Sequence, residues 1–216
     1  MTGAISFLCL SLMAQAFPLE DTFDGPDISA HWAVSVGTGG SFARLEPRDQ
    51  GRCLHLFGDG SETAAATATP VANIAYTLEY DFLQPADQAK GYEAVVSHLR
   101  PEGHCYWWLE FGLDRFFLYT VAGGHWYNRW AAYGFAVDTW YRIRIRNTPT
   151  TVQVSVLDAG GQRLIAESPP IPHDDGAAGP VRFAAVGDYR GVWGAKYDNV
   201  RLEVTPVAER DDYRRR

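Results

Sequence analysis

Alternating apolar and polar positions recur along this chain and predict short β-strands. In the run that ends at residue 82, Leu78, Tyr80 and Phe82 share one face, and polar residues occupy the positions between them. Ile143 and Ile145 repeat the pattern further along the chain, where arginines fill the alternate positions. No segment keeps an apolar stripe at helical spacing over the roughly 10–12 residues that a helix requires.

About fourteen such strands, separated by turn residues, predict an all-β fold. Strands of this length and number pack as two antiparallel sheets, which form a β-sandwich. Residues 17–206 contain neither a linker-like stretch nor an internal repeat, so we expect them to form one domain.

The first 16 residues are predicted to be a secretory signal. The segment from Ile5 to Met13 is apolar but too short to span a bilayer, and Ala14-Gln15-Ala16 is a small-x-small cleavage site. We therefore expect a secreted, periplasmic or cell-surface protein. Residues 207–216 are polar and end in three arginines, which predicts a tail without regular structure.

The formal net charge of −7 comes with 17 arginines and only two lysines. An acidic surface disfavours nucleic acid and anionic membranes as main partners, because both repel negative charge. No stretch after the signal resembles a membrane span.

The stretch from Gly103 to Trp130 contains ten aromatic residues with charged and amide side chains between them. A core needs aromatic residues, but it does not need four tryptophans beside polar groups. This mixture suits a surface that stacks on flat ligand faces and bonds to their edges. We interpret it as a groove that faces a polysaccharide or glycan.

Alternation divides the first part of this stretch between two faces. The face predicted to be core holds Cys105, Trp107, Leu109 and Phe111. The face predicted to be open holds Tyr106, Trp108 and Glu110, and His98 joins it if the preceding strand pairs as a hairpin. The alternative is that Trp108 caps the sandwich edge and Glu110 pairs with an arginine.

Two glycines, Gly123 and Gly124, free the backbone for a predicted loop from His125 to Trp130. This loop either contacts the ligand or folds over the end of the sandwich as an apolar plug. The complete predicted ligand-binding set is His98, Arg100, Tyr106, Trp108, Glu110, Trp126, Tyr127, Asn128, Arg129 and Trp130.

Three stretches carry a resemblance to a known superfamily. They are the opening Asp21-Thr22-Phe23-Asp24-Gly25 with Trp32, the central Trp140-Tyr-Arg-Ile-Arg-Ile145, and the closing Tyr197-Asp198-Asn199-Val200-Arg201-Leu202. Together they resemble the jelly rolls of the concanavalin A-like lectins and glucanases, and within them the secreted bacterial laminin-G-like and family-16-glycosidase-like domains. The resemblance implies a jelly roll over nearly the whole mature chain, with a ligand on the concave sheet. It specifies the fold better than the activity.

The resemblance leaves binding modules, hydrolases and polysaccharide lyases open. The Glu-x-Asp-x-x-Glu strand of family-16 glycosidases is absent, since the position three residues after Asp81 is Gln84. The Arg-Thr-Glu and Gln-Ile-His strands of jelly-roll alginate lyases are also absent. A carbohydrate-binding module is therefore the first hypothesis, and a lyase or atypical glycoside hydrolase is the alternative.

If the protein is an enzyme, the candidate catalytic residues are His98, Glu110 and Tyr127. In a lyase, Tyr106 or Tyr127 and His98 or His125 would supply base and acid, and Arg100 or Arg129 would neutralise a uronate.

Three further sets of residues have two interpretations each. The resemblance implies a structural calcium at Asp21 or Asp24 and Asp198, unless these residues only bond to the backbone, in which case no cofactor is expected. Cys53 and Cys105 either form a disulfide in an oxidising compartment or stay buried thiols. Arg142, Arg144 and Arg146 either bind acidic sugar groups or, as we favour, pair with acidic neighbours on an outer face.

Overall fold

The computed structural model describes residues 19–49, 51–68, 71, 75–88, 93–100, 104–112, 114–174, 179–186 and 191–205. These residues form sixteen β-strands and one short 3₁₀ helix, η1 (Ala86–Gln88). Every strand pairing in this part of the chain is antiparallel, so the predicted all-β fold is confirmed. The predicted signal over residues 1–16 and tail over 207–216 lie outside the described residues.

The larger sheet has nine strands. In spatial order its main path runs through β13 (Leu164–Glu167), β12 (Thr151–Asp158), β11 (Tyr141–Asn147), β6 (Tyr76–Leu83), β16 (Val192–Val204), β4 (Gly51–Asp59) and β3 (Phe42–Arg48). Two short strands lie off this path. β1 (Leu19–Asp21) pairs with β16, and β14 (Ile171–Pro172) pairs with β12.

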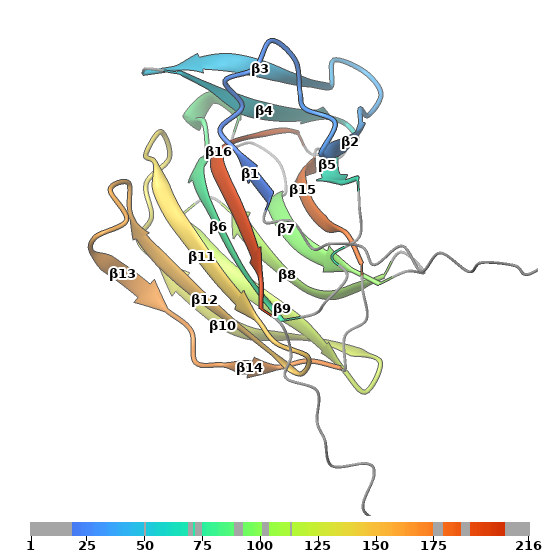
Figure 1. Ribbon diagram of the computed structural model, residues 1–216, viewed down its shortest axis with the longest axis vertical. Helices are drawn as coiled ribbons and strands as arrows, with labels where there is room; N and C mark the ends of the chain where they lie inside the picture. The colour runs from blue at the N-terminus through green and yellow to red at the C-terminus, as the bar shows by residue number, and fades with distance from the viewer. Residues whose placement is uncertain are drawn as a thin grey trace, which may run out of the picture.

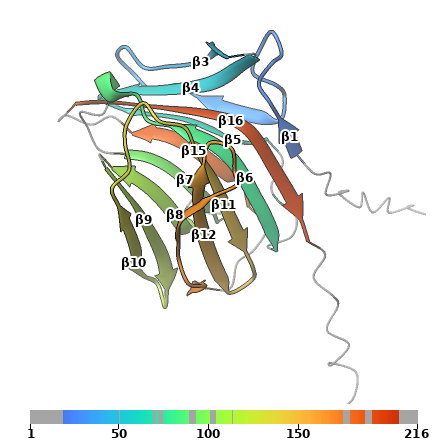
Figure 2. The same ribbon diagram turned by 90° about the vertical axis from the view of Figure 1, so that its left-hand side faces the viewer.

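The smaller sheet has seven strands. Its order is β10 (His125–Tyr133), β9 (Arg115–Ala122), β8 (Cys105–Gly112), β7 (Glu93–Leu99), β15 (Val181–Val186), β5 (Glu62–Thr67) and β2 (Trp32–Ser35). Figure 1 shows the nine-stranded sheet in front of the seven-stranded one. After a quarter turn, Figure 2 shows them as two stacked layers, so the predicted sandwich is confirmed.

The core lies between the sheets and consists of their inward positions. Leu78, Tyr80 and Phe82 of β6 point inward beside Ile143 and Ile145 of β11, and all five are almost completely buried. The two inward faces predicted from alternation are therefore confirmed. Full burial of each such side chain stabilises the fold by roughly 1.5–3 kcal/mol.

Hydrogen bonds cross this core, among them one of 3.1 Å from the Tyr197 hydroxyl of β16 to the Ala184 carbonyl of β15. The indole nitrogen of the fully buried Trp107 on β8 donates a hydrogen bond of 2.8 Å to Oδ1 of Asn147 at the end of β11. A buried donor without a partner costs about 1–3 kcal/mol, so this bond allows a tryptophan to occupy the interior. It also connects the two sheets. In the described part of the chain, no helix is long and apolar enough to cross a membrane.

Candidate functional site

Aromatic side chains gather on the outer face of the seven-stranded sheet, over β8, β9 and β10. The register places Trp108 directly opposite Tyr119. Ring centroids lie 4.1 Å apart for Trp126 and Trp108, 4.5 Å for Trp108 and Tyr119, 6.1 Å for Tyr119 and Phe117, and 6.3 Å for Phe117 and Tyr133. We call these five side chains the aromatic run.

Strand alternation puts the aromatic run outside the sandwich. Trp107 and Leu109 of β8 belong to the core, so Trp108 and Glu110 point to the opposite face. The predicted division of this strand is confirmed for these four residues.

The rings within the run have different roles. Trp108 is only half-buried, and two rings pack on it: Tyr119 stacks on it with an interplanar angle of 10°, and Trp126 meets it edge-on at 68°. Trp126 itself is 47% exposed. Trp108 therefore supports Trp126, and Trp126 is the more exposed ring, which a ligand reaches more readily.

Glu110 lies beneath these rings and is 8% exposed. Its Oε2 lies 3.5 Å from the indole nitrogen of Trp108, at the limit of a hydrogen bond, and the register places it opposite Phe117 and Val95. The Glu110 carboxylate is therefore placed to orient the Trp108 indole, and little of it is accessible to solvent.

Part of the remaining outer face is closed. Ala64, Val95 and Ala184, at outward positions of β5, β7 and β15, form a small buried cluster against which Trp108 packs. Next to this cluster, the outer face of β5 and β15 carries the partly exposed ion pair of Glu62 and Arg182. The aromatic surface of this sheet therefore lies over its β8–β10 half.

Two residues predicted on the open face are inside the sandwich. His98 is completely buried, with its ring 5.4 Å from that of Tyr106, and Tyr106 belongs to the core. The strand pairing shifts register between His98 and Leu99, and this bulge turns Tyr106 inward. Burial, and to a smaller extent His173, lower the pKa of His98 to about 4. The prediction that His98 acts as a catalytic or ligand-binding group is therefore wrong.

Arg100 also lies away from the aromatic run. Its guanidinium bonds to Asp174 at 3.0 Å and sits 4.7 Å from the ring centre of Tyr106. Three of the residues named for the lyase hypothesis, His98, Tyr106 and Arg100, are thus close together, but at the end of the sandwich and against its core. That arrangement does not form an acid–base site on the open face.

The segment from His125 to Trp130 is the start of the edge strand β10 and not the predicted loop. The turn before it requires its two glycines, since Gly123 and Gly124 have φ of +60° and +75°. Trp126 and Asn128 are on the outer face, and Asn128 lies opposite Tyr119. His125 is exposed at the first position of the strand.

The remaining residues of this segment point elsewhere. Trp130 pairs with the fully buried Leu118 and packs against the core. Tyr127 lies opposite the buried Thr120, on the inner side of the strand, and the guanidinium of Arg129 sits 3.9 Å from its ring centre. The structure therefore does not bring Tyr127, Arg129 or Trp130 to the aromatic run.

Phe117, Tyr119 and Tyr133 are missing from the predicted set. The alternation that divides β8 also divides Arg115–Ala122, where Phe116 and Leu118 are buried and the two aromatic residues between and after them are outward. Applying the pattern to that run identifies Phe117 and Tyr119 from sequence. Tyr133 depends on the register of β10, which has a bulge between Asn128 and Trp130.

The two cysteines are not paired. Cys53 is in β4 of the nine-stranded sheet and Cys105 is in β8 of the seven-stranded sheet, and both are free. The predicted disulfide is therefore absent from the structure. Burial raises the pKa of the Cys53 thiol to about 11 and also raises that of Cys105, so both side chains are neutral thiols at pH 7.

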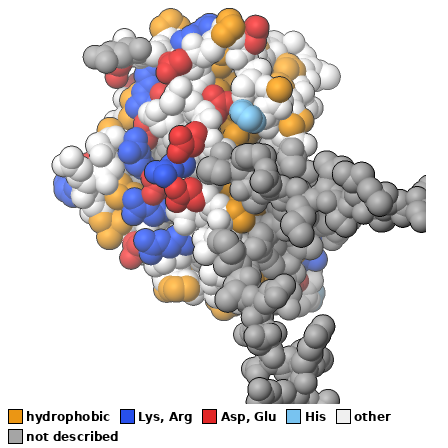
Figure 3. Space-filling view, viewed as in Figure 1, with side chains coloured by type: hydrophobic (Ala, Val, Ile, Leu, Met, Phe, Trp, Pro, Cys, Tyr) orange, Lys and Arg blue, Asp and Glu red, His pale blue; other side chains and the backbone are white. Residues whose placement is uncertain are grey.

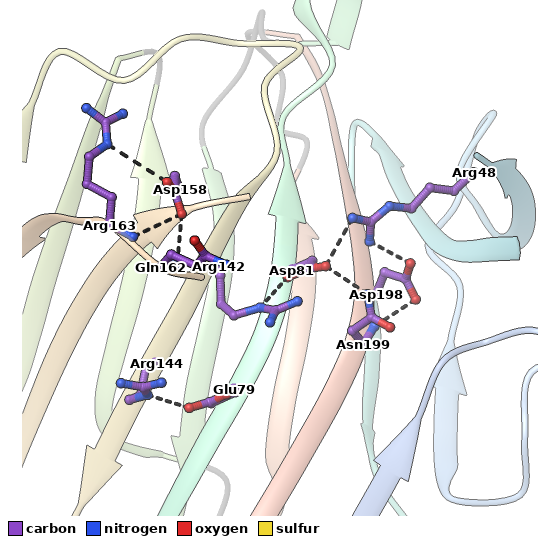
Figure 4. A network of polar contacts seen from close by, with 10 residues as sticks. All are labelled: Arg48, Glu79, Asp81, Arg142, Arg144, Asp158, Gln162, Arg163, Asp198 and Asn199. Carbon is purple, nitrogen blue, oxygen red and sulfur yellow. Dashed lines mark hydrogen bonds and ion pairs between the residues drawn. The ribbon is translucent and has the colours of Figure 1, made fainter. Parts of the chain in front are cut away.

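The outer face of the nine-stranded sheet is charged instead of aromatic. Figure 3 shows basic and acidic side chains side by side in a band across this face. Arg142 bonds to Asp81 at 2.8 Å and Arg144 bonds to Glu79, as Figure 4 shows. The preferred interpretation of the arginine row, an outer face paired with acidic neighbours, is confirmed for these two residues.

Arg48 is the centre of this charged face. Its guanidinium bonds to Asp198 at 2.6 Å and to Asp81 at 3.0 Å (Figure 4). It also lies 3.8 Å from the ring centre of Trp140. Asn199, with φ of +48°, donates to Asp81 at 2.8 Å. The carboxylates of Asp81 and Asp198 are almost completely buried and have little contact with water. The Arg48 guanidinium therefore provides the positive charge that balances them.

No protein-family model and no curated protein matches this sequence. Solved structures match the fold along most of the chain. Bacillus licheniformis beta-glucanase has a TM-score of 0.60 at 12% identity, covering 88% of this chain and 98% of its own. The VIP36 exoplasmic/lumenal domain bound to Ca²⁺ and Man3GlcNAc has a TM-score of 0.59 at 10% identity, covering 92% of both chains.

The carbohydrate binding module CBM66 from Bacillus subtilis has a TM-score of 0.51 at 14% identity, covering 80% of this chain and 95% of its own. The fold is a concanavalin A-like jelly roll. At these identities the likeness concerns the fold alone, because concanavalin A-like jelly rolls support different activities.

The concanavalin A-like VIP36 structure holds Ca²⁺, but the carboxylates predicted here for calcium bond to donors of the protein. Asp21 accepts hydrogen bonds from the Phe23 amide, the Ser29 hydroxyl and the Trp32 indole at 2.6–2.8 Å. Asp24 accepts from the Arg52 amide at 2.9 Å.

The third carboxylate, Asp198, bonds to Arg48, beside an open polar cavity of about 430 Å³. In the part of the chain that the structure describes, no three His, Cys, Asp or Glu side chains are grouped to hold a metal. Asp24 and Asp49 line the same cavity as Asp198, so calcium there stays a prediction that requires Asp24 and Asp198 to exchange their present protein partners for the ion.

Proposed function

We propose that this protein binds a polysaccharide or glycan on the outer face of its seven-stranded sheet. The observation that carries the proposal is the aromatic run, with Trp126 exposed and Asn128 beside it. A sugar ring presents C–H groups on its faces and hydroxyl groups on its edge. An exposed indole suits the first and an amide suits the second.

The similar structures support the same class of ligand. By their names, they include a glucanase, a carbohydrate binding module and a domain with a bound mannose glycan. Their sugars differ, so the likeness supports a glycan without selecting one.

Binding is favoured over lyase chemistry by the position of the candidate catalytic residues. A lyase needs an acid and a base that reach the sugar, but His98 is buried and uncharged at neutral pH. The alternative pair, His125 and Tyr127, is exposed but lies on the other side of β10 from Trp126. Glu110 is the carboxylate next to the aromatic run, and Glu62, on β5, is ion-paired with Arg182 at 2.6 Å. Neither of these carboxylates is free to complete a hydrolytic pair.

We also propose that the chain is exported, since the predicted signal at residues 1–16 fits an extracellular glycan ligand. Sequencing the N-terminus of protein recovered from the periplasm or medium of an expression host tests this. A chain that starts after Ala16 is the expected product, and an uncleaved chain retained in the cytoplasm would contradict export.

The test of binding compares two substitutions on one strand. Trp126→Ala removes an exposed ring from the outer face, and Tyr127→Ala removes a ring of similar exposure from the other side of β10. In affinity gels containing β-glucan, alginate or mannan, we expect Trp126→Ala to lose most of the retardation that wild type shows. Tyr127→Ala should keep it.

Melting temperatures of both variants should stay close to wild type, which confirms that the loss is local. Equal retardation of all three proteins in every gel that slows the wild type would refute the assignment of this face. Absence of binding to any member of a broad glycan array would refute the proposed function itself.

A further inference from the structure

We infer that the ligand is an extended glycan chain that lies along β9 and β10 and contacts both Trp126 and Tyr133. This inference rests on the proposed function and adds the length and direction of the ligand. It also assigns a binding role to Tyr133, at the far end of the aromatic run.

The two rings occupy opposite ends of one strand. Trp126 is the second residue of β10 and Tyr133 is the last, and they lie opposite Val121 and Arg115 on the outer face of β9. Because β10 has a bulge, the span is taken from their partners on β9, which are six residues apart and give about 20 Å at roughly 3.3 Å per residue. They are 47% and 65% exposed. The outer face thus presents two accessible rings that are too far apart for one sugar unit.

The surface between the two rings is suited to the middle of a chain. Asn128, exposed opposite Tyr119, provides a donor and an acceptor for hydroxyl groups. Ala131, opposite Phe117, has a methyl group only and leaves space above the half-buried ring. Phe117 contacts both Tyr119 and Tyr133, so the apolar floor is continuous.

The direction follows from what lies on either side of this strip. Towards β7, β15 and β5, the outward residues Val95, Ala184 and Ala64 are buried in their own cluster and offer no surface. On the other side, β10 is the edge of the sheet. A chain laid across the strands therefore leaves the rings and meets buried small residues and the ion pair of Glu62 and Arg182, whereas one laid along β10 keeps both rings in contact.

The ligand class that fits is a linear glycan, unbranched over several sugar units. A single terminal sugar would contact one ring and leave the other exposed. Each ring contact contributes about 0.5–1.5 kcal/mol, which corresponds to roughly two- to tenfold in affinity.

The experiment measures affinity against ligand length. After the glycan array identifies the sugar, its oligomers from disaccharide to decasaccharide are titrated into wild type, Trp126→Ala, Tyr133→Ala and the control Tyr127→Ala by calorimetry. We expect wild-type affinity to rise with length until the oligomer spans about 20 Å and then to level off.

Trp126→Ala should weaken binding at every length. Tyr133→Ala should weaken binding roughly two- to tenfold for the long oligomers and leave the short ones unchanged. Tyr127→Ala should match wild type throughout.

Two outcomes separate failure of this inference from failure of the proposed function. If affinity levels off at a disaccharide or trisaccharide and Tyr133→Ala binds every length like wild type, the extended chain is wrong while the glycan site remains. If Trp126→Ala also binds like wild type, or if wild type binds no glycan, the proposed function fails and this inference fails with it.

Discussion

The two outer faces of this sandwich are built by the same alternation but have opposite character. On the seven-stranded sheet, the outward positions of β8–β10 hold rings, and the terminal ones, Trp126 and Tyr133, are exposed. On the nine-stranded sheet, the outward positions hold charges that bond to one another, as Arg142 does to Asp81. The face of the seven-stranded sheet has exposed rings available for a ligand. On the face of the nine-stranded sheet, the charged side chains are paired with one another.

This contrast teaches how to distinguish a binding face from a structural one. The residue types in the sequence do not distinguish the two faces, because the arginine row and the aromatic stretch are equally easy to recognise there. What decides is whether the partners of each side chain lie within the protein. Asp81 is 1% exposed and bonded to two arginines, so it has no capacity left for a ligand.

The largest effect is expected from Arg48→Met. Removing this guanidinium leaves Asp198 and Asp81 close together and buried, and breaking a buried pair costs about 3–5 kcal/mol. Urea unfolding at pH 7 should show this loss, and glycan binding should be unchanged after correction for the folded fraction. A loss of glycan affinity in the folded variant would break the distinction between the two faces.

The pH dependence of the same variant gives an independent check. Burial already raises the pKa of Asp198, and loss of Arg48 should raise it further. A carboxylate whose folded pKa exceeds its unfolded value loses stability as the pH rises through the folded pKa. The deficit of Arg48→Met relative to wild type should therefore shrink as the pH is lowered. A deficit that is constant with pH would mean that the charge is not its cause.

The next effect is the loss of wild-type stability in acid, which comes from the buried His98. His98 has a pKa of about 4 in the folded state against an ordinary value of 6.5, so below pH 6.5 the unfolded chain takes up the proton first. Wild type should lose about 3 kcal/mol between pH 6.5 and 4 through this residue. His98→Gln should show a smaller loss over the same range in urea unfolding. Equal losses would exclude His98 as their origin.

A smaller change in stability, with a large change in binding, is expected from Trp108→Ala. Its half-buried ring supports Trp126, so its removal should cost about 2 kcal/mol and weaken glycan binding as much as Trp126→Ala does. Trp108→Phe keeps a supporting ring and should retain more affinity in the same gels. Wild-type affinity in the folded Trp108→Ala variant would show that Trp126 needs no support.

Arg144→Met is the matched control for Arg48→Met on the charged face. Its pair with Glu79 is partly exposed, at side-chain exposures of 32% and 26%. Such pairs contribute about 0.2–1 kcal/mol, so unfolding should shift only slightly. A loss of unfolding free energy as large as that of Arg48→Met would show that the exposed arginine row stabilises the fold as much as the buried Arg48 does.

Chelation should have the smallest effect. Because Arg48 supplies the positive charge beside Asp198, the melting temperature should be the same in excess EDTA and in excess Ca²⁺. A rise with Ca²⁺ that EDTA reverses would show that the described carboxylates rearrange to bind the ion.

The alternation of apolar and polar residues correctly predicted which side chains point inward on several strands. It identified the inward faces of β6 and β11 and placed Trp108 and Glu110 opposite Trp107 and Leu109. These are properties of successive residues in one extended strand, in which side chains must point to alternate sides. The all-β class and the paired arginine row follow from the same rule.

The errors arose where a residue depends on a neighbouring strand. A bulge beside Leu99 turns Tyr106 into the core, and another in β10 separates Asn128 from Trp130. A single inserted residue reverses every side chain beyond it, and no local pattern reports the insertion. Cys53 and Cys105 likewise lie in different sheets.

The order of residues along the chain is enough to predict a sandwich of amphipathic strands with more aromatic residues than its core needs. Which of these aromatic residues remain accessible depends on how the strands are arranged. Trp126 and Tyr133 are exposed because β10 is an edge strand, and Arg48 is held in a buried network because β3 and β4 bring it to β16. The physical reason is that exposure and pairing are set by strand order and register, which join residues far apart in the chain.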